Sequence, residues 1–190
     1  MASAPEPRRG DGSFLFVGRL SPEKGARLFC EAARRTGVAA RLVGDGPLRQ
    51  ELQRDFPEHA FAGWRNVAEV AGEMRGAQAL VFPSALYEGQ PLAVQEALAH
   101  GCPVIASDAG SGAEAIAHGR NGLHFRSGDA DSLAAAMSVL MDSTRANDMA
   151  RAAHEDYWRA PLTLERHLDG VWAVYRAAMI EPAGMTAAAG

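Results

Sequence analysis

Six short runs that are typical of strands, separated by stretches with helical spacing, restrict the fold of this chain more than any other feature. Each run has four or five residues, which is the length of a short buried strand. The runs are residues 14–17, 39–43, about 59–62, 79–82, 104–107 and 121–125. Strands that alternate with helices form a parallel sheet that is covered on both sides. The pattern therefore predicts an α/β fold with a doubly wound, mostly parallel six-stranded sheet and helices on both faces.

Composition indicates a soluble protein with one substantial core. The chain has 190 residues, of which 47% are apolar, and this is enough for one domain. A formal net charge of −4 without a basic stripe argues against a nucleic-acid partner. Cys30 and Cys102 show neither metal-site spacing nor a disulfide framework, which suits a reducing cytoplasm. No apolar run approaches the roughly 20 residues of a membrane span. We therefore expect a cytoplasmic protein without a membrane span.

Residues 79–106 form the most distinctive unit of the chain. A buried run is followed by a loop, by a helix that begins at Pro91 and ends at Gly101, and by a second buried run. Proline in the first helical turn and glycine just past the last turn are typical start and stop signals. Helical spacing places Glu96 on the side away from the core. The unit is a β-loop-α-β motif with two glutamates, Glu88 in the loop and Glu96 in the second helical turn.

The spacing of these glutamates, and the residues that follow them, resemble a known signature. Seven residues separate Glu88 from Glu96, which is followed by Ala-Leu-Ala-x-Gly-x-Pro-Val-Ile-Ala. This pattern is similar to that of the group-one retaining glycosyltransferases, whose two-domain fold is called GT-B. The resemblance implies that the chain is one half of a GT-B fold, the Rossmann-like, donor-binding C-terminal domain. Two glutamates alone would be ordinary solvated acids, but the order of the whole stretch favours the resemblance.

The resemblance also assigns roles to the residues of this segment. Glu96 would bind the ribose hydroxyls of a nucleotide-sugar, and Glu88 would contact the donor sugar near the reacting centre. The loop and helix start between them would face the sugar and the phosphates. These residues are Gly89, Gln90, Pro91 and Leu92. A helix N-terminus suits a diphosphate because its N–H groups and its dipole attract anions.

A second candidate segment, residues 18–25, follows the first apolar run with the sequence Gly-Arg-Leu-Ser-Pro-Glu-Lys-Gly. Ser21 as N-cap and Pro22 as first helical residue predict a helix that continues to about Thr36. Lys24 would then lie in the first turn, where the helix dipole disfavours a cation by a few tenths of a kcal/mol up to ~1. A bound anion would reverse that penalty.

This segment resembles the phosphate-binding loop of the same glycosyltransferases. The resemblance places Gly18 among the donor-binding residues and implies that Arg19 and Lys24 hold the donor diphosphate. Taken alone, the octapeptide is an ordinary turn between a strand and a helix. Its combination with the two spaced glutamates favours the functional interpretation.

Two loops at later strand ends supply weaker candidates. Gly44 begins a Gly-x-Gly turn, but Arg49 stands where a dinucleotide fingerprint needs its third glycine. Gly44 is therefore expected to form a tight turn, with at most one backbone contact to the donor. Trp64 and Arg65 lie where the resembled family borders the nucleotide base. Either they flank the base by stacking, or Trp64 packs on the sheet edge.

All of these candidates follow the carboxyl ends of predicted strands, which is the edge where open parallel sheets bind ligands. The pair Asp129 and Asp131 lies elsewhere, before an amphipathic helix, where acids cap N–H groups and suit the dipole. We interpret this Asp-x-Asp as capping rather than as a metal site. Since Arg19 and Lys24 would already neutralise the diphosphate, no metal or other cofactor is expected.

The chain is expected to have four parts. These are a flexible lead at 1–13, a nucleotide-sugar-binding domain at 14–158, a crossover and C-terminal helix at 159–180, and a frayed tail at 181–190. The helix carries an apolar stripe formed by Leu164, Leu168, Val171, Trp172 and Tyr175. In the resembled family part of that stripe would pack on the N-terminal domain, supplied by the same or a separate chain. Three other docking partners for the stripe stay open: its own domain, a second copy in a homodimer, or a separate partner. Peripheral membrane contact would be made by the N-terminal domain.

The resemblance implies transfer of a hexosyl unit from a nucleoside diphosphate sugar, with retention of configuration, to an acceptor that the sequence does not identify. The candidate catalytic residues are Arg19, Lys24 and Glu88. Because the acceptor half is not part of the matched segment, we expect this chain alone to bind donor but to transfer little or nothing. Two alternatives stay open: a sugar-nucleotide epimerase domain, and a non-catalytic partner or scaffold that retains the fold.

Overall fold

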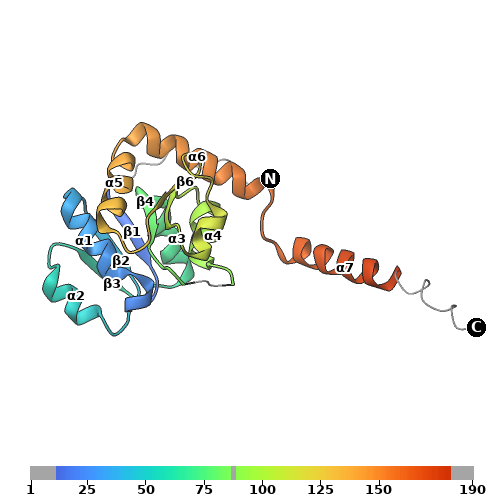
Figure 1. Cartoon of the computed structure of the whole chain (residues 1–190), viewed down its shortest axis with the longest axis horizontal. Coiled ribbons are helices and arrows are strands. Elements are labelled where there is room, and N and C mark those ends of the chain that lie inside the picture. The colour runs from blue at the N-terminus through green and yellow to red at the C-terminus, as the bar shows by residue number, and fades with distance from the viewer. Residues whose placement is uncertain (1–11, 87–88, 181–190) are drawn as a thin grey trace, which may run out of the picture. The chain divides into compact units, whose positions relative to one another are not determined.

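The computed structural model describes residues 12–86 and 89–180, and the chain divides into two units, Met1–Trp158 and Arg159–Gly190. The first unit has a central sheet with helices on both faces (Figure 1). The strands are β1 (Phe14–Val17), β2 (Ala40–Val43), β3 (Ala60–Gly63), β4 (Ala79–Phe82), β5 (Val104–Ser107) and β6 (Gly122–Phe125). Residues 1–11 of the predicted lead at 1–13, the predicted tail at 181–190 and Glu88 lie outside the described residues.

The sheet has the order β3-β2-β1-β4-β5-β6, and each neighbouring pair is parallel. The chain starts near the centre, winds outward to β3, then returns to place β4 on the other side of β1. Phe14 is consequently in register with Ala40 on one side and with Ala79 on the other. This confirms the predicted doubly wound α/β sheet. A crevice for ligands is expected where the winding reverses, at the carboxyl ends of β1 and β4.

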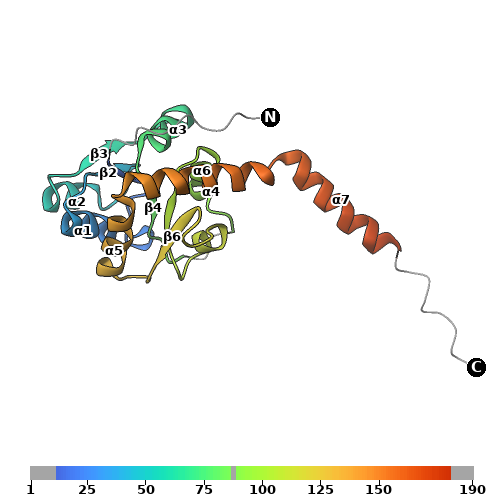
Figure 2. The ribbon, with the colours of Figure 1, turned by 90° about the horizontal axis from the view of Figure 1, so that it is seen from above.

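The helices are α1 (Ala26–Thr36), α2 (Arg49–Asp55), α3 (Val67–Gly76), α4 (Leu92–Ala99), α5 (Ala130–Leu140), α6 (Ser143–Arg159) and α7 (Leu164–Ile180), with short 3-10 helices at Pro22–Lys24 and Ser111–Ala115. Successive strand residues point to opposite faces of the sheet, so each face has its own core. Phe14 and Phe16 pack with α1 and α5, whereas Leu15 packs with α3 and α4. Figure 2 shows α3 and α1 on opposite sides of the sheet.

α6 links the two cores. Met149 belongs to the core under α1 and α5, whereas Ala153, one turn later, belongs to the core under α3 and α4. At the end of α6, the Trp158 indole N–H donates a hydrogen bond to the carbonyl of Ala99, 3.0 Å away, in the last turn of α4. The end of the first unit is therefore attached to the helix that carries Glu96.

The predicted start of the first helix is wrong. Pro22–Lys24 form a separate 3-10 turn, and α1 begins at Ala26 after Gly25, whose φ is 72°. A Cβ on Gly25 would lie 2.9 Å from the Cβ of Pro83, so close packing against the end of β4 requires glycine here. Lys24 therefore ends a 3-10 turn instead of lying in the first turn of an α-helix, and the predicted dipole penalty does not arise.

Two helix starts are capped by side chains. The Asp129 carboxylate accepts hydrogen bonds from the N–H groups of Asp131 (2.9 Å) and Ser132 (3.0 Å), which confirms the predicted cap of α5. Asn66 and Glu69 form a capping box at the start of α3. The capping box thus fixes the C-terminal end of the loop that contains Trp64 and Arg65.

The second unit contains α7, and the helix exposes the large apolar side chains of the predicted stripe. In the part of the chain that the structure describes, no helix combines the length and the apolar character needed to cross a bilayer.

Candidate functional site

A pocket of about 270 Å³ lies at the carboxyl ends of β1 and β4. It joins the loop after β1 to the start of α4, two segments that are about 70 residues apart in the chain and become neighbours because β1 pairs with β4. Its lining residues are Phe16, Val17, Gly18, Arg19, Lys24, Phe82, Pro83, Ser84, Gln90, Pro91, Leu92 and Ala93. Six of the residues predicted from the sequence are therefore brought together: Gly18, Arg19, Lys24, Gln90, Pro91 and Leu92.

The positive charge of the pocket comes from the loop after β1. Arg19 is exposed and Lys24 is half-buried, and both line the pocket. Glu23 lies between them in sequence, but its carboxylate accepts a hydrogen bond from the buried Ser21 hydroxyl, 2.6 Å away. That hydrogen bond lowers the pKa of Glu23, with smaller contributions from its own backbone N–H and from the charges of Arg19 and Lys24. The loop carries two cations and one acid, so its net charge is positive.

The opposite wall of the pocket is the N-terminus of α4. Pro91 is the N-cap residue and makes no side-chain cap hydrogen bond, while its carbonyl accepts from the N–H groups of Val94 (3.0 Å) and Gln95 (3.3 Å). The N–H groups of the first helical turn, at Leu92 and Ala93, have no intrahelical acceptor, and both residues line the pocket. Two cations and a helix N-terminus therefore face one cavity, an arrangement that attracts an anion.

Of the two predicted glutamates, the structure describes Glu96, and it is not among the described residues that line this pocket. Glu96 is exposed, as predicted, and lies four residues after the pocket residue Leu92, which places both on one side of α4 about one turn apart. A ligand that extends from the pocket along α4 would reach Glu96. Glu88 lies outside the described residues, and its neighbour Gly89 is exposed.

Glycines end the three adjacent strands β1, β2 and β3. Gly18, Gly44 and Gly63 follow or close these strands with φ values of 155°, 134° and 72°. A Cβ on Gly44 would lie only 1.9 Å from the carbonyl oxygen of Gly18, so Gly44 does not itself line the pocket but directly supports a residue that does. The ends of β1 and β2 therefore pack on each other through their backbones, without an intervening side chain.

Trp64 and Arg65 follow β3, which is two strands away from β1, and they do not line the pocket. With neighbouring strands about 4.8 Å apart, the end of β3 is roughly 10 Å from the end of β1. The Trp64 side chain is 74% exposed, so it does not pack on the sheet edge, which was one of the two alternatives. Arg65 Nε lies 3.9 Å from Glu69 of the capping box.

Sequence reasoning missed the floor of the pocket. Ser84 is 1% exposed, lines the pocket, and accepts a hydrogen bond from the N–H of Leu86 (3.3 Å). The Cα of Gly110 packs against its carbonyl, since a Cβ there would lie 2.4 Å from that oxygen. Ser84 lies two residues after the buried run 79–82, and this position near a carboxyl strand end was the available signal.

Within residues 12–86 and 89–180, no three His, Cys, Asp or Glu side chains gather as a metal site.

Comparison with known proteins gives consistent matches. The family model for Glycosyl transferases group 1 matches residues 11–143. A GDP-mannose-dependent alpha-mannosyltransferase of Corynebacterium glutamicum is 35% identical over 141 residues, which are 74% of this chain and 34% of that protein. A glycogen synthase of Mycobacterium tuberculosis is 34% identical over 165 residues, covering 80% of this chain and 40% of that protein.

Solved structures show the same fold. A structure of Anabaena HepE in complex with UDP superposes with a TM-score of 0.77 at 23% identity, over 88% of this chain and 49% of that one. The C-terminal domain of LpcC, a glycosyl transferase group 1 family protein from Francisella tularensis, has a TM-score of 0.72 at 24% identity, over 80% of this chain and 86% of that one.

The chain spans between a third and two fifths of the length of these two curated relatives, but most of the isolated LpcC domain. The match is therefore to one of the two domains that make up a GT-B protein. The chain belongs to the group 1 glycosyltransferases and corresponds to their C-terminal type of domain.

Proposed function

We propose that this chain is the donor-binding domain of a retaining glycosyltransferase that transfers a hexosyl unit from a nucleoside diphosphate sugar. The observation that carries the proposal is the pocket in which Arg19 and Lys24 face the N-terminus of α4. A diphosphate carries the charge that such a pocket attracts. The relatives support this ligand class, since one is named for GDP-mannose and a structural neighbour was solved with UDP.

In this proposal, each residue contacts a different part of the donor. In the reaction, the bond between the anomeric carbon of the sugar and a diphosphate oxygen breaks, and negative charge grows on the departing diphosphate. Arg19 and Lys24 would stabilise that charge, an effect worth several kcal/mol in a preorganised site. Glu96 would accept hydrogen bonds from the ribose hydroxyls, and Glu88 would orient the sugar.

The nucleoside would extend away from the pocket. Glu96 lies one turn further along α4 than the pocket residue Leu92, and the exposed Trp64 lies about 10 Å from the end of β1. A base beside Trp64 and Arg65 could stack on the indole and pair with the guanidinium. Arg19 and Lys24 supply the positive charge that a metal ion would otherwise bring, so the proposed reaction uses no metal or other cofactor.

The acceptor site belongs to the other half of the enzyme. The curated relatives are more than twice as long as the segment that this chain matches, so an N-terminal domain, in the same or a separate chain, would bind the acceptor. We propose a cytoplasmic enzyme, since nucleotide-sugars and reduced cysteines are consistent with that compartment.

Calorimetric titration of the chain with UDP, GDP, UDP-glucose and GDP-mannose tests the proposal. We expect binding of at least one nucleoside diphosphate, and a 10- to 100-fold weaker affinity after Arg19→Ala or Lys24→Ala, because a charge-assisted contact to phosphate contributes about 1.5–3 kcal/mol. Arg151→Ala, an exposed α6 residue paired with Asp148, is the matched control and should leave the affinity unchanged. Absence of heat and of chemical-shift changes at millimolar ligand would favour a scaffold that has kept the fold and would refute the proposal.

A further inference from the structure

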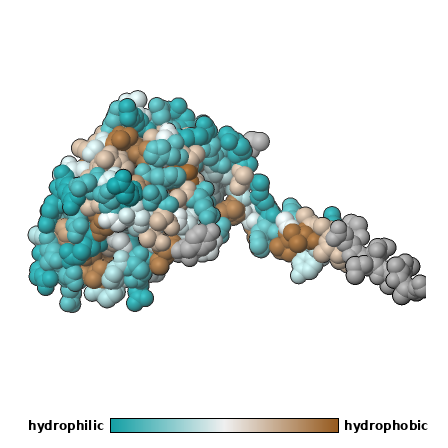
Figure 3. All heavy atoms as spheres, in the orientation of Figure 1, coloured by the Kyte–Doolittle hydropathy of each residue, from teal (hydrophilic) through white to brown (hydrophobic). Residues whose placement is uncertain are grey.

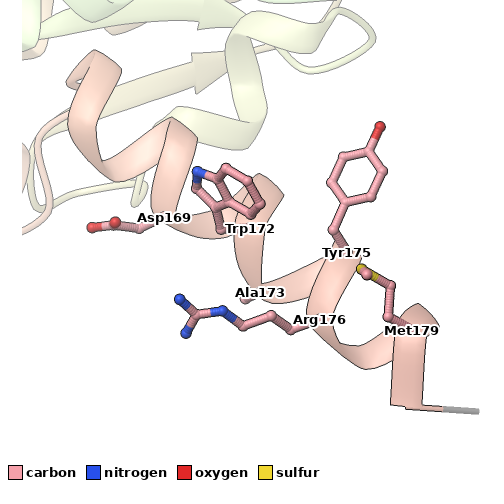
Figure 4. A pocket seen from close by; sticks show the side chains of 6 residues that line it. All are labelled: Asp169, Trp172, Ala173, Tyr175, Arg176 and Met179. Atoms are coloured by element: carbon pink, nitrogen blue, oxygen red, sulfur yellow. The ribbon is translucent and has the colours of Figure 1, made fainter.

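The exposed face of α7 is accounted for by the second domain of the family. Apolar side chains, drawn in brown, gather on this helix in Figure 3. A shallow hollow of about 390 Å³ runs along the helix, and Asp169 and Arg176 border it (Figure 4). This face carries the apolar stripe that we expect to pack on the N-terminal domain, so it indicates no additional partner.

An ion pair between Asp45 and Arg49 lies at the carboxyl end of β2. Asp45 Oδ2 accepts a hydrogen bond from Arg49 Nη1, 2.9 Å away, and Asp45 Oδ1 accepts one from the N–H of Gly46 (2.8 Å). The Gly46 N–H and, next, the Arg49 guanidinium lower the pKa of Asp45, so its carboxylate is ionised at neutral pH. The side chains are 58% and 33% exposed. The pair therefore presents a hydrogen-bond acceptor next to a donor at the surface.

Contacts on both sides place this pair between the loop after β1 and Trp64. The N–H of Leu20 donates to the carbonyl of Asp45, 2.9 Å away, so the loop after β2 lies against the loop after β1. On the other side, a Cβ on Gly63 would lie 3.4 Å from both terminal nitrogens of Arg49, so the guanidinium packs against the residue before Trp64. The strand order β3-β2-β1 arranges the three strand ends in the same way. A ligand that reaches from the loop after β1 to Trp64 therefore passes the ion pair.

We propose that Asp45 and Arg49 select the base of the donor, accepting uracil and guanine and rejecting adenine and cytosine. This selection rests on the proposed function, which places a diphosphate in the pocket and the base beside Trp64. Uracil and guanine share one edge, a carbonyl oxygen next to a ring N–H. Arg49 donates to that oxygen, and the Asp45 carboxylate accepts from that N–H.

The other two bases reverse this pattern. Adenine and cytosine carry an amino group and a bare ring nitrogen at the same positions, so a donor would face the guanidinium and a lone pair would face the carboxylate. Polar groups left unpaired in this way are the main source of discrimination between similar ligands. The capacity is present, since a carboxylate accepts several hydrogen bonds and a guanidinium donates several, and the contact between Asp45 and Arg49 uses only one of each.

Calorimetric titration of the full chain with UDP, GDP, inosine diphosphate, CDP and ADP tests the selection. We expect CDP and ADP to bind about 10- to 100-fold more weakly than UDP and GDP. Inosine diphosphate has the shared edge without the amino group of guanine, so it should bind as GDP does. Pyrophosphate has no base and reports on the pocket alone. Equal affinities for all five nucleotides would overturn the selection and leave the proposed function intact, whereas no binding of any ligand would refute both.

The variant Asp45→Asn keeps the size of the side chain and removes its charge. Loss of a negative charge by itself strengthens the binding of an anion, so weaker binding would report the lost contact to the base. We expect about tenfold weaker binding of UDP and GDP, little remaining discrimination against CDP and ADP, and no loss of pyrophosphate affinity. Asp148→Asn, in an exposed ion pair on α6, is the matched control and should change none of these affinities.

The urea midpoints of both variants verify that they are folded, and the comparison of nucleotides on the unmodified chain needs no variant. If Asp45→Asn weakened all nucleotides and pyrophosphate by the same factor, the pair would only brace its loop, and the proposal would be overturned.

Discussion

Gly44 shows how a residue outside the pocket determines its geometry. Its Cα lies against the carbonyl of Gly18, and Gly18 borders the pocket beside Arg19. The N–H of Gly44 also donates to the carbonyl of Gly63, 2.8 Å away, so the ends of β1, β2 and β3 are tied together through their backbones. No side chain fits between them. The sequence suggested a tight turn at Gly44, and the structure gives the reason, which is contact between neighbouring strand ends.

Gly44→Ala should therefore destabilise the chain by about 3 kcal/mol, because the new methyl group overlaps the Gly18 carbonyl and the backbone has a positive φ. Urea unfolding followed by circular dichroism measures the change. Gly72→Ala in α3 is the matched control, since a Cβ there meets no atom within 4 Å. That substitution should stabilise the protein by about 0.5–1 kcal/mol. A Gly44→Ala variant as stable as wild type would show that the strand ends separate readily.

At the scale of elements, α1 is held to the connection between α2 and β3 by one ion pair. Arg34 Nε donates to a Glu58 carboxylate oxygen at 2.7 Å, and the Arg34 guanidinium lies 4.3 Å from the centre of the Phe56 ring. The Arg34 hydrogen bond, with smaller contributions from a backbone N–H and from the nearby charges, lowers the pKa of Glu58 from its ordinary value of 4.5 to about 2. A carboxylate with a lowered pKa in the folded state stabilises that state only while it is ionised.

The contribution of Glu58 should accordingly be complete above pH 4.5 and should be lost as the pH falls from 4.5 towards about 2. In this window the unfolded chain binds the proton more readily than the folded chain does. Glu58→Gln should flatten the decline of the urea midpoint with falling pH, and Glu155→Gln, an exposed α6 residue, should preserve it. Equal slopes for wild type and Glu58→Gln would contradict the role of the pair.

Elements set by local chemistry were predictable, and contacts between distant segments were not. The strands 14–17, 79–82 and 104–107 were placed correctly because a buried run is visible in the sequence itself. The start of α1 was misplaced because Ser21 and Pro22 resemble a helix start, while the interruption at Gly25 comes from Pro83, some 60 residues later.

The candidate site divides in the same way. Arg19 and Lys24 could be matched to Gln90, Pro91 and Leu92 because all of them follow strand ends at one edge of a parallel sheet. The separation of Trp64 from this pocket depends on strand order, which the sequence does not state.

At the scale of the whole molecule, the two units differ in what they contribute to folding. In the described part of the chain, neither hydrophobic core includes a residue after 157. The first unit should therefore keep its core when the second is removed.

A chain that ends at residue 160 should unfold at the wild-type urea midpoint and bind nucleoside diphosphates with wild-type affinity, because the pocket and both cores are retained. Denaturant unfolding and calorimetry measure the two properties. Loss of donor binding in a folded truncated chain would show that α7 contributes to the pocket.

The pairing of β1 with β4 has a consequence for the order of events during synthesis. The cationic loop is complete once residue 25 has been made, but its opposite wall is made only when the chain reaches α4, about 70 residues later. A nascent chain that ends before α4 has the charges without the cavity. Under the proposed function, affinity for the nucleotide-sugar would therefore arise only once α4 has been made and β1 has paired with β4, and a product released before that point would not compete for the donor.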